Sequence, residues 1–558
     1  MARSSQVAIW SIESRFDSDA IILAPSELLS RTRRMIVLSV WRILYRKTTR
    51  ILPYFDPLND DEVLIRLGRR PLLNRSFGFM SILGLSCSAL CSWEGILVTS
   101  VPSFTTGGPA VVIWTFVVGW IGITSVYTVM AELSSIAPTA GGQYHWVAMM
   151  APESCSNFLT YLTAWLTTLA WQAIAITTSY LITTTLQGVV VLARPSYIPL
   201  PWHTLLIMWA SILFAVLINS TTGRFLARLE GVILILHLVG FFGILVPLVY
   251  FSPHNDASVV FTDFFDNGGW GSQGLTFFVG LPSIASTLIG ADCAVHMSEE
   301  IQSAATVVPQ ALVYTIFING SLAFAMTIAL MFCITDIDAA MAAAETMFYP
   351  FLEVFQSGVN STTGAVIMSS VVLILAAAST VGVYASASRM IWSFSRDNGL
   401  PFSRHLAKRS SLPIYAIFST MGISSLISLI VLGPAVALSA LLSLVVAALY
   451  SSYMIVCGLF LWRRCTGSFR KAEDACDPAE GLVWGPWKLP EPLGILNNVF
   501  ACLYSAVVLF WSFWPQTTAP TPETFNWSIL IFGAVVLFSI VWYMIRARHH
   551  FRGPIKEI

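Results

Sequence analysis

Long stretches without a charged residue recur along this chain and constrain its fold more than any other feature. Residues 154–193 and 412–462 contain no Asp, Glu, Lys or Arg. Hydrophobic residues make up 56% of the 558 residues and charged residues only 11%, whereas about a quarter of a soluble domain is charged. Because about 20 apolar residues cross a bilayer as one helix, the sequence predicts an all-α, polytopic membrane protein.

The apolar segments predict twelve transmembrane helices. The Gly433–Pro434 pair separates the ninth from the tenth, since glycine followed by proline ends a helix. The expected spans cover residues 77–99, 109–131, 157–187, 202–220, 228–251, 274–298, 307–334, 361–395, 412–432, 434–462, 493–514 and 525–545.

The distribution of Lys and Arg predicts the orientation in the membrane. With twelve spans, all 30 basic residues except Arg194 fall in the tails and loops on the side of the termini. The positive-inside rule therefore places both termini in the cytoplasm. Residues 35–52 mix apolar and basic positions, so they belong either to a cytoplasmic tail or to a helix lying on anionic lipid. The expected parts are a cytoplasmic tail (1–75), five spans (76–251), five further spans (252–462), a cytoplasmic loop (463–490), two last spans (491–547) and a cytoplasmic tail (548–558).

Two acidic residues, Glu94 and Asp292, lie inside the predicted first and sixth spans. An acid at the centre of a membrane helix costs about 2.5–3.5 kcal/mol on insertion scales and normally faces a cavity or a partner. Every Lys and Arg falls in tails, loops or span ends. The partner of each acid is therefore a backbone amide, a bound cation or a proton; the alternative is a protonated acid that bonds a neighbouring helix.

Both acids lie beside a glycine, in "CSWEG" (91–95) and "LIGADCAVH" (288–296). Glycine weakens a helix, and a broken helix is tolerated at mid-membrane only where it lines a cavity. Corresponding breaks in two halves of a chain indicate a transporter binding site between inverted repeats. Trp93 would offer an aromatic face to an ammonium group. Trp165 in the third span either lines the same cavity or packs in the core.

Several other classes of site are disfavoured. The chain has no HExxH, P-loop or GxSxG motif and no paired CxxC, so we expect neither an enzyme nor a metal or cofactor site. No basic stripe with interleaved aromatics indicates a nucleic-acid partner. Asn360 and Asn526 begin glycosylation sequons in loops expected on the outer side.

Three segments resemble the amino acid–polyamine–organocation permeases. "AELSSIAPTAGGQYHWVAMMAP" (131–152) is similar to the segment after their second span, and "SASRMIWSFSRDNGLPFS" (386–403) to the end of their eighth. "GADCAVHMSEEI" (290–301) resembles the sixth-span signature of the fungal amino acid/choline branch, which includes choline and GABA permeases. The resemblance runs from about residue 60 to residue 515 and implies a five-plus-five inverted-repeat core with unwound helices 1 and 6.

The resemblance also implies a binding site, carried over by position. It assigns Ser92, Trp93, Glu94 and Gly95 to the unwound part of helix 1, and Ile289, Gly290, Ala291 and Asp292 to that of helix 6. The "SWEG" sequence departs from the small, glycine-rich pattern that holds an amino acid's carboxylate, and it suits a cationic head better. His237 in the fifth span, with Glu94, is a candidate for proton coupling, or else it is a packing residue. Glu299, Glu300 and Arg389 are candidates for an inner gate, or else solvated charges at helix ends.

The function expected from this resemblance is secondary active transport. The solute would be choline, GABA or a related amine-bearing compound, taken up with a proton across a lipid bilayer, the plasma membrane in the first place. A receptor without transport activity on the same scaffold, or a general amino acid permease, are the alternatives.

Overall fold

The computed structural model describes residues 60–221, 223–408, 412–433, 436–470, 482–522 and 524–556. The expectation for residues 35–52 lies outside these ranges. In the described part the only strands are β1 (Phe469–Arg470) and β2 (Leu482–Val483), a short parallel pair. All other regular structure is helical, as the sequence predicts.

The helices follow one another with short connections. Their bounds are α2 (Asp60–Arg66), α3 (Phe79–Leu90), α4 (Ser92–Thr99), α5 (Val101–Ile136), α6 (Gln143–Met150), α7 (Ser156–Ala193), α8 (Pro201–Asn219), α9 (Gly223–Phe251), α10 (Ala257–Thr262), α11 (Gln273–Thr287), α12 (Cys293–His296), η1 (Ser298–Glu300), α13 (Ala304–Cys333), α14 (Ile337–Met347), α15 (Pro350–Val359), α16 (Thr362–Arg396), α17 (Ser403–Leu406), α18 (Ile414–Ile427), η2 (Ser428–Leu432), α19 (Val436–Cys465), α20 (Glu491–Trp511), α21 (Ser528–Trp542), η4 (Tyr543–Ala547) and α22 (Arg548–His550).

Eleven helices of the described part are long and apolar enough to cross a membrane. They coincide with eleven of the twelve expected spans, with α3 and α4 together forming the first. The expected span at 274–298 is not among them. Its helix α11 has only 15 residues and ends at Thr287, and α12 begins after a non-helical segment. The protein is therefore polytopic, with one expected span interrupted too early to qualify as a continuous membrane helix.

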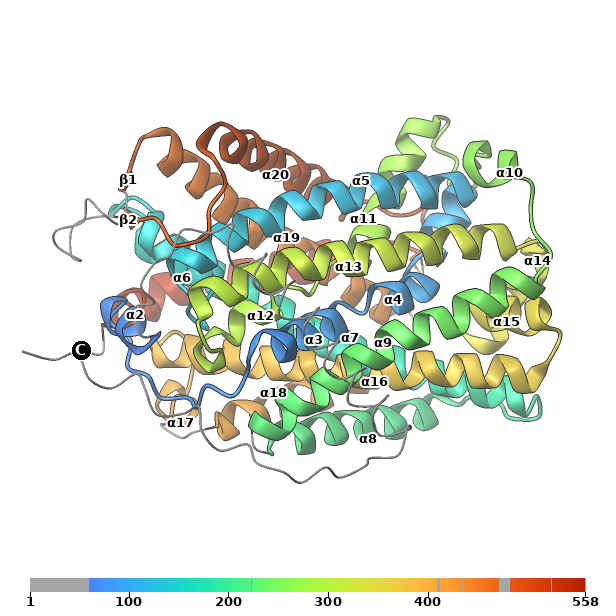
Figure 1. Ribbon diagram of the computed structural model, residues 1–558, viewed down its shortest axis with the longest axis horizontal. Coiled ribbons are helices and arrows are strands. Elements are labelled where there is room, and N and C mark those ends of the chain that lie inside the picture. The colour runs from blue at the N-terminus through green and yellow to red at the C-terminus, as the bar shows by residue number, and fades with distance from the viewer. Residues whose placement is uncertain are drawn as a thin grey trace, which may run out of the picture. The chain divides into compact units, whose positions relative to one another are not determined.

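The long helices run side by side and leave the short ones at two opposite ends (Figure 1). The helices α2, α6 and α17 lie at one end, and α10, α14 and α15 lie at the other (Figure 1). We call the first the basic end, because the side chains of Arg69, Arg389, Arg396 and Arg464 lie there. In the interior, α7 packs against α16 and α19, while α5 packs against α11 and α13. These contacts enclose the two interrupted segments.

Candidate functional site

The first predicted break is real but lies one residue earlier than the sequence indicates. Helix α3 ends at Leu90, and Cys91 adopts a left-handed conformation with φ 45° before α4 begins at Ser92. Residues 92–95, expected to be unwound, form the first turn of α4 instead. A negative charge is favourable in the first turn of a helix, which suits Glu94 to this position. The interruption is thus a one-residue kink at Cys91.

The second break is wider and lies where the sequence predicts it. Residues 288–292 are not helical, and Gly290 has a φ of 129°. A Cβ atom on Gly290 would lie 3.1 Å from the Ala89 carbonyl oxygen, so the close approach to α3 requires glycine. The Tyr127 hydroxyl accepts a hydrogen bond from the Gly290 N–H (3.0 Å) and lies 3.3 Å from the Leu288 carbonyl oxygen. Backbone groups freed by the break are therefore partly satisfied by α5.

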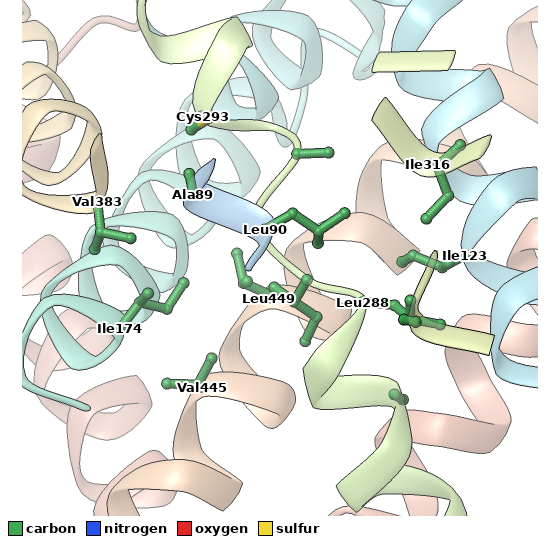
Figure 2. Close-up of a cluster of buried hydrophobic side chains, with 14 of the residues drawn as sticks. Ala89, Leu90, Ile123, Ile174, Leu288, Cys293, Ile316, Val383, Val445 and Leu449 are labelled. Carbon is green, nitrogen blue, oxygen red and sulfur yellow. The ribbon is translucent and has the colours of Figure 1, made fainter. Parts of the chain in front are cut away.

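A cavity of about 110 Å³ lies between the two breaks. Figure 2 shows the apolar side chains gathered around the end of α3, among them Leu90, Ile174 and Val445, which line this cavity. Helices α7, α16 and α19 supply its walls, in agreement with the expectation that spans three, eight and ten enclose the site. Among the described lining residues none is charged or aromatic, and six carry hydroxyl groups: Thr99, Thr177, Thr178, Ser286, Thr287 and Ser379.

A second cavity of about 330 Å³ adjoins the first on the side away from the basic end. The two share Thr99, Leu181 and Ser286 as lining residues. The larger cavity extends to the loop after α20, where Trp514 is 40% exposed. A continuous path therefore leads from that end of the protein to the breaks.

Glu94 and Trp93 do not line either cavity in the described structure; they face α9. The Glu94 carboxylate (Oε1) lies 2.7 Å from His237 Nδ1, and both side chains are buried. Trp93 packs against the rings of His237 and Phe241. The sequence analysis found no Lys or Arg for Glu94, and the structure supplies an imidazole as its partner. The two residues expected to take part in proton coupling are thus in direct contact.

Of the remaining expected binding residues, Gly95 and Ile289 line the smaller cavity and two others lie elsewhere. Asp292 is buried at the start of α12, where its Oδ2 accepts a hydrogen bond from Gln143 Nε2 (2.8 Å). Trp165 packs against Phe394 and Phe538 in a separate aromatic cluster. Trp165 therefore takes the packing role that the sequence left open.

Glu230 is a buried acid that the sequence analysis missed, because it lies at the edge of the expected fifth span. Its Oε2 is 2.7 Å from the Ser88 hydroxyl, which also lies 3.1 Å from the Leu85 carbonyl oxygen. Within the described part of the chain its Oε1 has no hydrogen-bond partner. Glu230 precedes His237 by two helical turns of α9, about 10 Å. A protonated Glu230 would satisfy this chain by donating to Ser88, which donates to Leu85.

Buried ion pairs close the basic end. Arg389 Nε donates to Glu300 Oε1 at 2.8 Å, and Arg396 Nη1 donates to Glu299 Oε2 at 2.8 Å. Glu299 is 3% exposed and Glu300 2%, so the alternative of solvated helix-end charges is wrong. The Phe77 N–H also donates to the Glu300 carbonyl oxygen (3.1 Å), which joins the start of span one to the end of the broken segment.

A second set of contacts at this end converges on Asp397, which follows the last residue of α16. Arg69 Nη2 and the Tyr144 hydroxyl both donate to its Oδ2, at 2.7 and 2.8 Å. Burial, and then the nearby Asp397 charge, hold the pKa of the Tyr144 hydroxyl well above its usual range, so the hydroxyl stays protonated and donates. A carboxylate at a helix C-terminus is electrostatically unfavourable, and these donors compensate for it.

The two predicted glycosylation sites differ in their surroundings. Asn360 is exposed at the end of α15. The Asn526 amide nitrogen instead donates to the carbonyl oxygens of Ser512 (2.8 Å) and Trp514 (3.2 Å). Asn526 also lines the larger cavity, where a glycan would not fit. As for metals, no group of three or more His, Cys, Asp or Glu side chains suited to an ion occurs among the described residues.

Comparison with known proteins agrees with this architecture. Residues 77–535 match the amino acid permease family. The chain is 26% identical to a choline transporter of Saccharomyces cerevisiae over 518 residues, covering 91% of this chain and 88% of that protein. It is 27% identical to a putative amino acid/polyamine transporter of Macrophomina phaseolina over 458 residues, 80% of this chain and 96% of the relative. It is 25% identical to amino-acid permease 2 of Neurospora crassa over 503 residues, 89% of each.

The family match covers both breaks, the cavity between them and ten of the eleven membrane helices completely. The resemblance inferred from the three motifs is thereby confirmed at the level of the family. The chain belongs to the amino acid permease family and is a membrane transporter of the amino acid and amine type, not an enzyme.

Proposed function

We propose that the protein imports a small zwitterionic amino compound by alternating access, with the substrate bound in the cavity between the two breaks. The observation that carries this proposal is the uncharged, hydroxyl-lined cavity where α4 begins and α11 ends. The positive-inside rule makes the basic end cytoplasmic, so the larger cavity opens outward. For this path to act as a transport route, the broken segment 273–300 must count as a twelfth crossing.

The chemistry of the lining favours a zwitterion over a quaternary ammonium ion. A cation without a carboxylate of its own needs an acid or aromatic faces around it, and the described lining offers neither. A zwitterion carries both charges. Its carboxylate would meet the N–H groups of the first turn of α4, to which Cys91 gives no side-chain cap. Its ammonium group would meet carbonyl oxygens at the end of α11. This narrows the expected solutes to GABA-like or small neutral amino acids rather than choline.

The Glu94–His237 pair supports coupling to a proton. An ionised Glu94 in the first turn of α4 competes with a substrate carboxylate for the same helix end. A proton bound by the pair neutralises this charge and makes anion binding more favourable. Within the described structure Glu94 Oε2 and His237 Nε2 have no hydrogen-bond partner, which leaves the pair room to gain or lose a proton. Proton and substrate binding are thus linked through one helix terminus.

The ion pairs Glu300–Arg389 and Glu299–Arg396, together with the Arg69–Asp397 contact, form the inner gate in this account. They are broken when the site turns to the cytoplasm, where water can solvate the separated charges. The described conformation is then outward-open, with the inner gate closed. Asn360 is the proposed glycan acceptor on the outer side.

Uptake measurements in proteoliposomes test the proposal directly. GABA and small neutral amino acids should accumulate when the outside is acidic, a protonophore should abolish accumulation, and choline should be a poor substrate. Efficient choline uptake, with no inhibition by zwitterions, would overturn the substrate assignment. Binding without flux would identify a receptor instead.

A matched pair of variants tests the coupling. Glu94→Gln should lose proton-driven accumulation but keep exchange of labelled for unlabelled substrate, since exchange needs no net proton movement. Glu230→Gln is the comparison, because Glu230 is equally buried on the path side of α9 but does not contact His237. Loss of accumulation in the Glu230 variant alone would move the coupling site from Glu94 to Glu230.

A further inference from the structure

The C-terminal segment beyond α22 returns to the protein instead of leaving it. Phe551 is fully buried, with its ring centroid 5.1 Å from that of Tyr161 and 6.0 Å from that of Phe394. Tyr161 belongs to α7 and Phe394 to α16, two helices that also line the substrate cavity. The phenyl ring therefore lies between two helices of the transport path.

The same segment continues to the inner gate. The Ile555 N–H donates to Asp397 Oδ1 at 2.9 Å, while Arg69 and Tyr144 hold the other oxygen of that carboxylate. Both oxygens of Asp397 are thus engaged, one of them by the C-terminal segment.

This segment also contacts the chain that precedes Arg69. A Cβ atom on Gly68 would lie 3.0 Å from Lys556 Cγ, and Gly68 has a φ of 76°, so the close approach depends on glycine. The N-terminal and C-terminal segments therefore brace each other at the carboxylate where the gate is closed.

Opening toward the cytoplasm must separate Arg69 from Asp397, because both are buried in the closed gate. The contacts of Phe551 and Ile555 are made to the same two elements, α16 and the segment around residue 68. We propose that residues 551–556 form a strap that holds the inner gate closed, so that its release is part of every inward opening. This inference rests on the proposed function, since it takes the described state as outward-open.

The test uses the full-length protein in cells and follows the rate at which a membrane-impermeant thiol reagent modifies Cys91 from outside. Cys91 lines the smaller cavity, so its modification reports the outward-open fraction. Phe551→Ala should lower the initial rate by roughly threefold or more, as the population shifts inward. Arg552→Ala is the matched control, because Arg552 is exposed and its loss should leave the rate unchanged.

A second variant keeps the proposal testable if Phe551→Ala fails to reach the surface. Ile555→Pro removes only the N–H donor to Asp397 and should lower the labelling rate in the same direction. Wild-type rates in a variant with normal surface abundance would overturn the strap. If wild type itself is not labelled, the outward-open assignment fails first, so the two failures are distinguishable.

Discussion

The two ends of the transport path are built from different chemistry. Toward the outer end, two adjoining cavities of about 110 and 330 Å³ are lined by hydroxyl, aromatic and aliphatic side chains. At the basic end the same helices are joined by buried pairs such as Arg389–Glu300 and Arg69–Asp397, at 2.8 and 2.7 Å. One end closes by packing, and the other by charge.

This difference indicates how each end can open. Aromatic and hydroxyl side chains separate with little electrostatic cost. A buried ion pair that loses one partner leaves an uncompensated charge, which costs about 3–5 kcal/mol. The inner gate therefore stays closed until both charges of a pair can reach water together, whereas the outer path needs only small rearrangements.

The largest expected effect comes from blocking the uncharged end. Ser286 lines both cavities, so Ser286→Trp should fill their junction and reduce uptake to background while surface abundance holds. Ser286→Ala, which removes only the hydroxyl, should transport normally. Substantial uptake by the tryptophan variant would show that the substrate takes another route.

The next largest effect comes from the charged end. Glu300→Gln leaves Arg389 buried without its carboxylate, and the closed gate should lose about 3–5 kcal/mol of stability. Initial uptake should fall and efflux from preloaded proteoliposomes should rise.

The charge-exchanged double variant Glu300→Arg/Arg389→Glu is the control for this prediction. It restores a pair across the same gate and should recover part of the lost uptake. If the double variant behaves like the sum of the two single variants, the pair has no coupling energy and does not act as a gate.

The smallest effect is expected for a residue outside both regions. Trp165 packs with Phe394 and Phe538, so Trp165→Phe should cost about 1–2 kcal/mol of stability and leave the KM for uptake within about twofold of wild type. A thermal-stability assay and uptake kinetics on the same preparation separate the two quantities. A large rise in KM at unchanged stability would return Trp165 to the binding site.

The sequence predicted the features that depend on local chemistry. Apolar length gave the spans, and glycine beside an acid identified both interruptions. It did not predict which way Glu94 points, since a single left-handed residue at Cys91 rotates everything that follows it. Nor does local sequence reveal pairs that are distant along the chain, such as Glu94 with His237 or Arg69 with Asp397. Glu230 was missed because an acid near a span end usually reaches water.

The thiol of Cys91 offers the most direct test of the central claim, that the substrate cavity lies at the breaks and faces outward. An impermeant, cationic methanethiosulfonate reagent added outside should modify Cys91 and block uptake, and saturating substrate should protect it. The Cys91→Ser variant should transport and resist the reagent. Equal sensitivity of wild type and Cys91→Ser, or modification of Cys91 only from the cytoplasmic side, would contradict the account.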